Sequence, residues 1–241
     1  HNNWSLTTDD GVNLLNPGRT PAQNTQFLIF LMAVIKAVDD YADLMRISAA
    51  SAGNDHRLGG NEAPPAIVSV FLGDELTRVL ESIENDTYFG KQEKIQLDTG
   101  APVLPHFLKD NTDRNRTSPF AFTGNKFEFR MLGSAASVAT PNIILNTAVA
   151  ESLDQFYEEL KDTEPADMDE AVHALLKRAI QKHKKVIFNG NGYSDEWVEE
   201  AARRGLDNLE STPDCLERLL SPKSISLLTK HHIFTKDEIC S

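Results

Sequence analysis

Apolar residues recur at helical spacing in two long stretches of this chain. Apolar positions from Phe27 to Met45 cover a wide helical face, preceded by Thr20-Pro21 and followed by residues 51–54. A threonine cap with proline in the first turn is a helix start, and the glycine at position 53 is a helix stop. A second helix is predicted from Thr140-Pro141, with apolar residues at the same spacing through Phe156. These patterns predict two long core helices.

Short β-branched and aromatic segments predict strands between these helices. They are residues 4–6, 66–72, 120–122 and 126–131, the last two joined by a Thr123-Gly124-Asn125 turn. Residues 74–84 are predicted to form a short helix, and residues 56–65, 85–94 and 102–113 to be loop or irregular. The expected fold class is α+β, with an antiparallel sheet flanked by helices.

The composition changes beyond Lys161. Charged amphipathic helices are predicted over residues 168–185, 194–205 and 213–220, separated by glycine-rich and proline-containing turns. We therefore expect a division of the chain into residues 1–160 and a C-terminal helical extension of residues 161–241. The basic run Lys182-His183-Lys184-Lys185 is interpreted as a helix end, where cations favour the helix dipole. His231-His232 is interpreted as a solvated helix end.

Composition and charge exclude several classes of partner. With 40% hydrophobic and 25% charged residues, the chain is typical of globular proteins, and its formal net charge of −12 repels phosphate backbones, so nucleic acid is not expected as a partner. The longest apolar run, residues 27–35, is too short to span a membrane. Two distant cysteines, Cys215 and Cys240, favour a reducing compartment, and hence a cytoplasmic location.

The chain begins at His1, without an initiator methionine, and a strand is predicted directly afterwards. We therefore expect it to be a piece of a longer protein, with part of any site lying upstream.

Candidate chemistry is concentrated in the strand around Glu128. Glu128 and Arg130 are two residues apart and so share one face of a strand, whereas Phe127 and Phe129 share the other. Arginine suits bidentate recognition of carboxylate or phosphate, and a carboxylate can hold a hard cation such as magnesium. The pattern indicates a site for an anionic, metal-bound substrate. A surface ion pair is the alternative, and the more common meaning of an isolated E-x-R motif.

Four motifs occur together in one order: residues 1–6 (HNNWSL), residues 57–65 (RLGGNEAPP), residues 115–117 (NRT) and residues 128–130 (EFR). In this order they resemble the catalytic domain of glutamine synthetases across residues 1–160, and most closely the large bacterial type III class. The resemblance implies that residues 1–160 are the C-terminal part of the catalytic domain and residues 161–241 a helical extension.

The resemblance also implies a reaction. In this family ATP phosphorylates the side-chain carboxylate of glutamate, and ammonia displaces the phosphate to give glutamine. The implied cofactors are ATP and Mg²⁺ or Mn²⁺, and the implied partners are glutamate, ammonia and other copies of the chain in a large homo-oligomer with sites at subunit interfaces. Charge developing on phosphoryl oxygens is stabilised by arginines and divalent cations placed in advance, which agrees with the residue types present.

Roles at the metal and at glutamate carry over by motif position. His1 and Glu128 match ligands of one metal ion, and the remaining metal carboxylates are expected upstream. Arg57 and Arg130 match arginines at the glutamate site. Glu62 matches the flap glutamate that closes the site and helps to deprotonate ammonium or the tetrahedral adduct.

Roles at the nucleotide are implied in the same way. Arg116 matches an arginine facing the transferred phosphate, and Asn3, Ser5 and Lys126 fall on positions lining ATP. The implied catalytic group is therefore Glu62, Arg57 and Arg116.

The sequence also departs from the family pattern. The segment from Arg57 to Glu62 is one residue shorter than in commoner classes, Asn3 replaces a histidine, and Lys126 replaces an arginine. A second arginine expected shortly after Arg116 is absent. These departures leave two alternatives: a non-catalytic assembly or regulatory module on the same fold, and a ligase that uses another amine.

Overall fold

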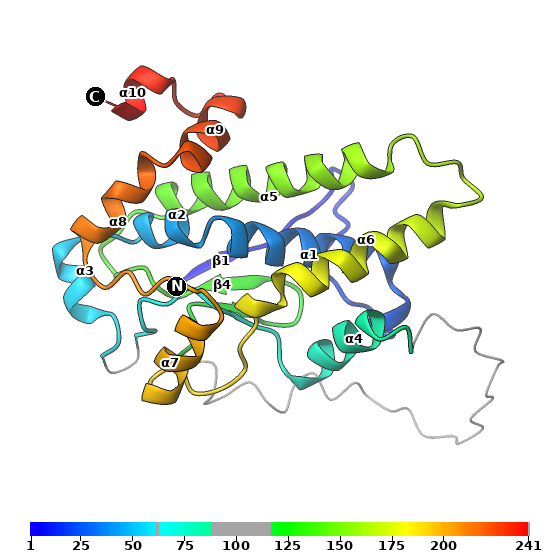
Figure 1. Ribbon diagram of the computed structural model, residues 1–241, viewed down its shortest axis with the longest axis horizontal. Helices are drawn as coiled ribbons and strands as arrows, with labels where there is room; N and C mark the ends of the chain where they lie inside the picture. The colour runs from blue at the N-terminus through cyan, green and yellow to red at the C-terminus, as the bar shows by residue number, and fades with distance from the viewer. Residues whose placement is uncertain (61–62, 88–116, 241) are drawn as a thin grey trace.

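The computed structural model describes residues 1–60, 63–87 and 117–240. It shows a mixed α/β fold in which many helices surround a small sheet (Figure 1). Glu62, Arg116, residues 88–94 and the whole predicted irregular segment 102–113 lie outside the described residues.

The sheet has four strands in the order β1-β4-β3-β2. The strands are β1 (Asn2–Trp4), β2 (Val70–Phe71), β3 (Phe120–Phe122) and β4 (Phe127–Phe129). The pairs β1–β4 and β3–β4 are antiparallel, and β2–β3 is parallel, with Val70 opposite Phe120. The expectation of an antiparallel sheet is therefore wrong for one pair. Parallel strands need a crossover, and helix α4 (Asp74–Glu84) lies in the connection between β2 and β3.

Helices α1 (Thr25–Asp40) and α5 (Ala139–Leu160) cover one face of this sheet, and α6 (Met168–His183) lies beside them (Figure 1). The ring of Phe27 on α1 lies 6.0 Å from that of Phe122 on β3. On the same face, Trp4 Nε1 of β1 donates to Asn146 Oδ1 of α5 at 2.7 Å. Phe127 and Phe129, predicted to share the apolar face of their strand, are fully shielded from solvent, and so is Phe120 of β3.

The first long helix begins and ends differently from the prediction. Thr20-Pro21 leads into a short 3₁₀ turn, η1 (Pro21–Gln23), and the side chain of Asn24 then caps α1 by accepting a hydrogen bond from Phe27 N. The helix breaks at Tyr41, whose φ of −125° is not helical, and α2 (Ala42–Ile47) follows. The second long helix begins at Ala139, one residue before the predicted cap Thr140.

The first charged tract is helical where loop was predicted. Ser51 Oγ accepts a hydrogen bond from Asn54 N at 3.2 Å and starts α3 (Ala52–Arg57). Ser51, which was predicted to belong to the end of the preceding helix, is thus the N-cap of α3. Its extended backbone leaves the hydroxyl free to accept a hydrogen bond from an N–H of the first turn. Arg57 consequently lies in a helical last turn.

Helix α4 has the predicted bounds, and the extension is helical as expected. Its elements are α6, η4 (Lys184–Val186), α7 (Asp195–Arg203), α8 (Thr212–Leu219), α9 (Pro222–Lys230) and α10 (Lys236–Cys240), of which the last two were not predicted. One hydrophobic core contains residues from both sides of residue 161, including Phe120, Leu175 and Leu228. The division at that residue stays a prediction. No helix formed by the described residues is long and apolar enough to cross a membrane.

The extension also joins the sheet. Ile187 forms a parallel bridge with Val70, and Phe188 N donates to Val70 O at 2.9 Å, so this segment covers the outer edge of β2. Next to it, Asn189 Oδ1 accepts from the backbone N–H groups of Leu72 and Gly73 at 3.1 and 3.0 Å. The extension therefore fixes the point at which β2 turns into α4.

Candidate functional site

The face of β1 and β4 opposite the buried phenylalanines carries most of the predicted site residues. Side chains alternate along β1, so that Asn2 and Trp4 are buried while Asn3 is exposed. Asn3 lies opposite Glu128 in the antiparallel register. By the same alternation, this face is shared by His1, Asn3, Ser5, Lys126, Glu128 and Arg130. Six residues predicted from the sequence therefore lie on one surface.

His1 and Glu128 come together on this face. Nδ1 of His1 lies 3.8 Å from Oε2 of Glu128, and the two side chains are 49% and 21% exposed. A neutral imidazole nitrogen and a carboxylate oxygen are both donors for Mg²⁺ or Mn²⁺, and the pair is accessible from solvent. The two residues fit a divalent cation as part of its ligand set.

Arg130 binds the same carboxylate. Its Nε and Nη2 donate to Oε2 of Glu128 at 3.1 and 2.9 Å. Arg130 is 7% exposed, so the pair differs from the solvated surface ion pair that is the common meaning of an E-x-R motif. The guanidinium orients the Glu128 carboxylate beside His1.

Arg57 lies at the end of β4, next to Arg130. Its Nη1 donates to the carbonyl oxygen of Met131 at 3.1 Å, and its Nη2 donates to that of Arg130 at 3.4 Å. The structure therefore brings the two predicted glutamate-binding arginines to the same end of one strand, although they are far apart in the sequence.

Asn54 orients Arg57 and was missed by the sequence analysis. Asn54 Oδ1 accepts from Arg57 Nη1 at 3.0 Å, while its Nδ2 donates to the carbonyls of Met131 and Ala49 at 2.7 and 2.6 Å. Residues three apart on a helix share a face, so the i, i+3 spacing of Asn54 and Arg57 would have been a usable signal if α3 had been predicted.

The predicted nucleotide residues receive less support from the geometry. Ser5 Oγ donates to Asn13 Oδ1 at 3.1 Å and to Asn125 O at 3.0 Å, so this hydroxyl holds the β3–β4 turn. Asn13 also donates to Asn125 O at 2.9 Å and was not singled out from the sequence. Asn3 is exposed and Lys126 half-buried. Both are accessible to a ligand on this face.

Hydrogen bonds join the described residues on either side of Glu62. Gly59 has a φ of +78°, in the left-handed region that favours glycine, and its N–H donates to Pro64 O at 2.9 Å. Ala63 N donates to Gly60 O at 3.1 Å. These bonds hold residues 63–64 close to the end of α3.

A second group of potential metal ligands lies elsewhere. One atom from each of Asp39, Asp40 and His183 lies within 4.8 Å of the others. Lys36 pairs with Asp40, and Lys185 Nζ lies 3.4 Å from Asp39 Oδ1, so each carboxylate already has an ammonium partner. His183 Nδ1 lies 2.7 Å from Asp39 Oδ2. The arrangement is an ion-pair network that ties α6 to α1.

The basic run lies at a helix end as predicted, because α6 ends at His183, whereas the expectation that His231 is solvated is wrong. His183, within the basic run, is buried at 2% exposure because it bonds to Asp39. His231 lies 2.7 Å from Glu151, which also pairs with Lys230. Burial would raise the pKa of Glu151, but the hydrogen bonds from Lys230, His231 and Gln155 outweigh it and lower the pKa. Both histidines join distant helices.

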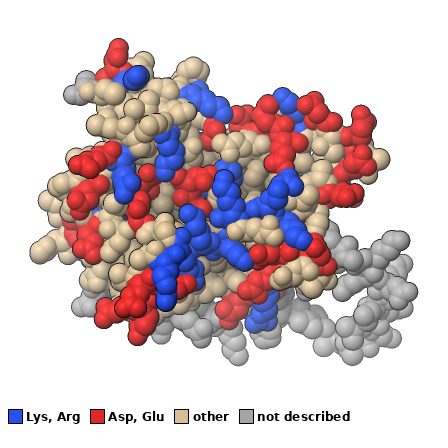
Figure 2. Space-filling model, viewed as in Figure 1, with Lys and Arg blue, Asp and Glu red and all other residues tan. Residues whose placement is uncertain are grey.

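Lysines and arginines gather over the end of α6 and beside α7 (Figure 2). In this region Lys184 Nζ lies 2.7 Å from Glu84, and Arg204 Nε lies 2.8 Å from Glu200. Arg204 also lies over the ring of Trp197, 5.4 Å from its centroid. These charges are matched within the protein, which agrees with the interpretation of the basic run as a structural helix end.

Comparison with known proteins shows strong similarity to one family. The model of the glutamine synthetase C-terminal domain matches residues 171–241. Along essentially its whole length, the chain is 52% identical to a glutamine synthetase of Butyrivibrio fibrisolvens, 51% identical to a type-3 glutamine synthetase of Dictyostelium discoideum and 46% identical to a glutamine synthetase of Bacteroides fragilis (strain YCH46). The matched region is 34%, 33% and 34% of these relatives, so the chain spans about a third of their length.

Proposed function

We propose that this chain, which is homologous over its whole length to one third of glutamine synthetases, is the part of a glutamate–ammonia ligase that binds glutamate and one metal ion. The proposed reaction transfers the γ-phosphoryl group of ATP to the side-chain carboxylate of glutamate. Ammonia then attacks the acyl phosphate, and phosphate leaves as glutamine forms.

The observation that carries the proposal is the shared face of β1 and β4. An imidazole, a carboxylate and an arginine converge there, with the His1–Glu128 distance at 3.8 Å and the Arg130–Glu128 distance at 2.9 Å. Arg57 adds a second guanidinium at the strand end. This set of groups matches a substrate that is anionic and a reaction that needs a divalent cation.

We assign the residues of the chain the following roles. His1 and Glu128 hold the cation, which when bound screens phosphoryl oxygens and makes the phosphorus a better electrophile. Arg57 and Arg130 hold the carboxylate groups of glutamate, since each presents several N–H donors in a planar fork. Arg130 also fixes the rotamer of Glu128, because both Nε and Nη2 donate to one oxygen.

The remaining roles rest on the resemblance. Glu62 would accept a proton from ammonium or from the tetrahedral adduct, and Arg116 would face the transferred phosphate. Asn3, Ser5 and Lys126 would line ATP. We also propose that the complete enzyme is cytoplasmic, uses Mg²⁺ or Mn²⁺, and assembles into a large homo-oligomer in which neighbouring subunits complete each site.

The test is a steady-state assay of the full-length protein. We expect phosphate release that requires ATP, Mg²⁺, glutamate and ammonia together. Replacement of Arg57 by lysine should raise the KM for glutamate about tenfold or more, because the charge is kept but the planar fork is lost. A change from Arg203, which is 71% exposed in its side chain, to lysine is the matched control.

Other outcomes would favour the alternatives. Release of phosphate with an organic amine in place of ammonia, found in an amine screen, would identify a ligase with another acceptor. If no phosphate were released from ATP, with or without Mg²⁺, the result would favour the non-catalytic module.

A further inference from the structure

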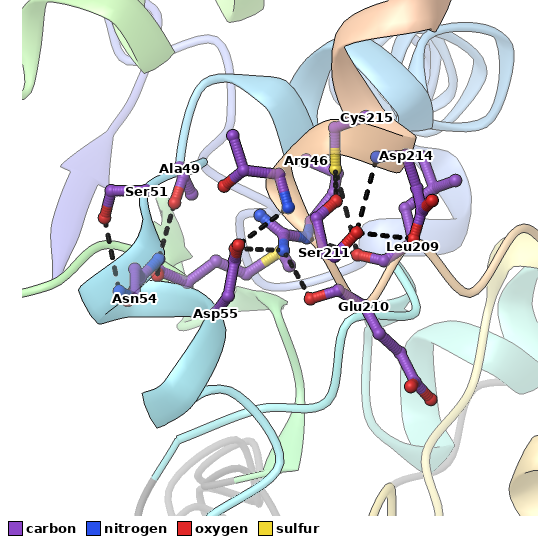
Figure 3. Close-up of polar contacts among 12 residues, drawn as sticks. Arg46, Ala49, Ser51, Asn54, Asp55, Leu209, Glu210, Ser211, Asp214 and Cys215 are labelled. Atoms are coloured by element: carbon purple, nitrogen blue, oxygen red, sulfur yellow. Dashed lines mark hydrogen bonds and ion pairs between the residues drawn. The ribbon is translucent and has the colours of Figure 1, made fainter.

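A buried arginine, Arg46, joins three segments of the chain (Figure 3). Arg46 of α2 is 1% exposed. Its Nε donates to Leu209 O at 2.7 Å, and its Nη2 donates to Asp55 Oδ1 at 2.7 Å and to Glu210 O at 3.1 Å. Arg46 thus binds both α3 and the segment that enters α8.

Asp55 makes a second bond to the extension. Its Oδ2 accepts from the backbone N–H of Thr212, at the start of α8, at 2.6 Å. Burial would raise the pKa of Asp55, but the hydrogen bonds from Arg46 and Thr212 outweigh it and lower the pKa. The carboxylate is therefore charged at neutral pH. It has one partner on α2, Arg46, and one at the start of α8, Thr212.

Helix α3 depends on such contacts for its position. It has six residues, and a helix of that length is not stable without tertiary contacts. On one side, Asn54 and Arg57 bind the carbonyl of Met131 after β4. On the other side, Asp55 binds the extension. Arg57 is the last residue of this helix, two positions after Asp55.

A partly open cavity separates part of α3 from the extension. It has a volume of about 270 Å³, with Asp55, Leu58, Gly59, Asn208 and Glu210 in its lining. The bonds of Asp55 to Thr212 and to Arg46 span the edge of this cavity and connect α3 to the extension.

We propose that Asp55 is a positioning residue for glutamate binding: by holding the N–H of Thr212 and the guanidinium of Arg46, it fixes α3 so that Arg57 faces the substrate. The C-terminal extension thereby determines affinity for glutamate. This inference rests on the proposed function, because it takes Arg57 to bind glutamate.

Thr212 offers a sharp test because its N–H can be removed without touching α3. Thr212 is the first residue of α8, a position at which proline is well tolerated. The change from Thr212 to proline removes the donor to Asp55. The matched control is Thr212→Ala, which keeps the N–H that donates to Asp55 and removes only the side-chain hydroxyl.

The experiment compares T212P, T212A and D55N in the full-length enzyme. For T212P and D55N we expect the KM for glutamate to rise about tenfold, the factor expected for loss of one hydrogen bond to a charged group. The KM for ATP should change less than about twofold, since Asn3, Ser5 and Lys126 lie on or next to β1 and β4 and not on α3. Hydrogen exchange of the amides of residues 52–58 should become faster. T212A keeps the backbone N–H and should therefore lie closer to the wild type than to T212P in all three measurements.

Each result has a distinct meaning. Unchanged exchange in residues 52–58 of T212P would overturn the positioning role, whatever the activity. Faster exchange with an unchanged KM for glutamate would overturn the connection to substrate. If the wild-type enzyme released no phosphate, the proposed function would fail and the glutamate part of this inference with it, while the exchange comparison would still decide whether Thr212 positions α3. If D55N did not fold, the T212P and T212A pair would give the answer alone.

Discussion

Oε2 of Glu128 lies 3.8 Å from Nδ1 of His1, on the neighbouring antiparallel strand. The two residues are 127 positions apart, and the pairing of β1 with β4 brings them together. Because Arg130 donates two hydrogen bonds to the same oxygen, the carboxylate has one preferred orientation. The pair is therefore preorganised before any ligand arrives.

Replacement of Glu128 by glutamine should weaken divalent-metal binding in the full-length enzyme. The amide keeps the shape of the side chain but loses the charge that attracts the cation. We expect the affinity for Mn²⁺, measured by calorimetric titration, to fall at least about 10- to 100-fold, the range seen even for outer partners of metal ligands. Glu158→Gln, in an exposed pair with Lys161, is the control and should leave the affinity unchanged. Equal affinities in both variants would contradict the metal role of Glu128.

Replacement of Arg46 by methionine should destabilise the protein. The change leaves the half-buried carboxylate of Asp55 without its guanidinium partner and removes the donors to the carbonyls of Leu209 and Glu210. Breaking one side of a fully buried ion pair costs about 3–5 kcal/mol, and because Asp55 is partly exposed, the free energy of unfolding should fall by about 2–3 kcal/mol. The measurement is urea unfolding, with Arg203→Met as the control for an exposed pair worth about 0–1 kcal/mol. If the free energy of unfolding fell no further than in the control variant, the bonds of Arg46 would not be needed for stability.

Ionisation of Tyr41 should lower the stability of the protein at high pH. Burial, followed by the negative charges of Glu151 and Asp40, raises the pKa of Tyr41 from 10.0 to about 12. Because the pKa of Tyr41 is higher in the folded than in the unfolded protein, its protonation contributes fully to folding stability below pH 10. This contribution is lost as the pH rises toward 12. The loss is about 3 kcal/mol, from 1.36 kcal/mol per pKa unit.

The measurement for Tyr41 is the free energy of unfolding at pH 9 and pH 12 in the wild type and in Tyr41→Phe. The wild type should lose more stability than the variant over this interval. Tyr157→Phe, at a residue that is 63% exposed, should follow the wild type. Parallel curves for all three proteins would show that Tyr41 titrates normally.

An alanine at position 192 should strain the junction between the extension and the strand that begins at Phe120. A Cβ on Gly192 would lie 2.8 Å from the backbone oxygen of Thr117, and the N–H of Gly192 donates to Thr117 Oγ1 at 2.8 Å. Overpacking of this kind costs about 1–3 kcal/mol, to be measured as a lower unfolding midpoint in urea. Gly53→Ala is the matched control, because its Cβ would meet nothing within 4 Å and should favour α3 by up to about 1 kcal/mol. An unaltered midpoint for the Gly192 variant would mean that the loop shifts freely.

The elements that follow local rules were predictable. The β3–β4 hairpin follows from alternating phenylalanines and from Gly124, whose φ is +93°. Helices α7 and α8 have serine caps, Ser194 and Ser211, whose hydroxyls accept first-turn N–H groups. In such elements the side chains that decide the structure are neighbours in the sequence.

Other features depend on contacts that no local pattern contains. The parallel pairing of β2 and the position of α3 both depend on partners far along the chain, such as Asp55 and Thr212, which are 157 residues apart. The same holds for the site. Alternation places Glu128 and Arg130 on one face, but only the fold brings Arg57 to the carbonyl of Arg130.

The contact of Ile187 and Phe188 with Val70 has a practical consequence for anyone shortening this protein. A truncation before residue 187 would leave the backbone of β2 as a bare, apolar edge, and such edges recruit strands from other molecules. Removal of the helical tail would thus produce precipitation or fibre growth during expression.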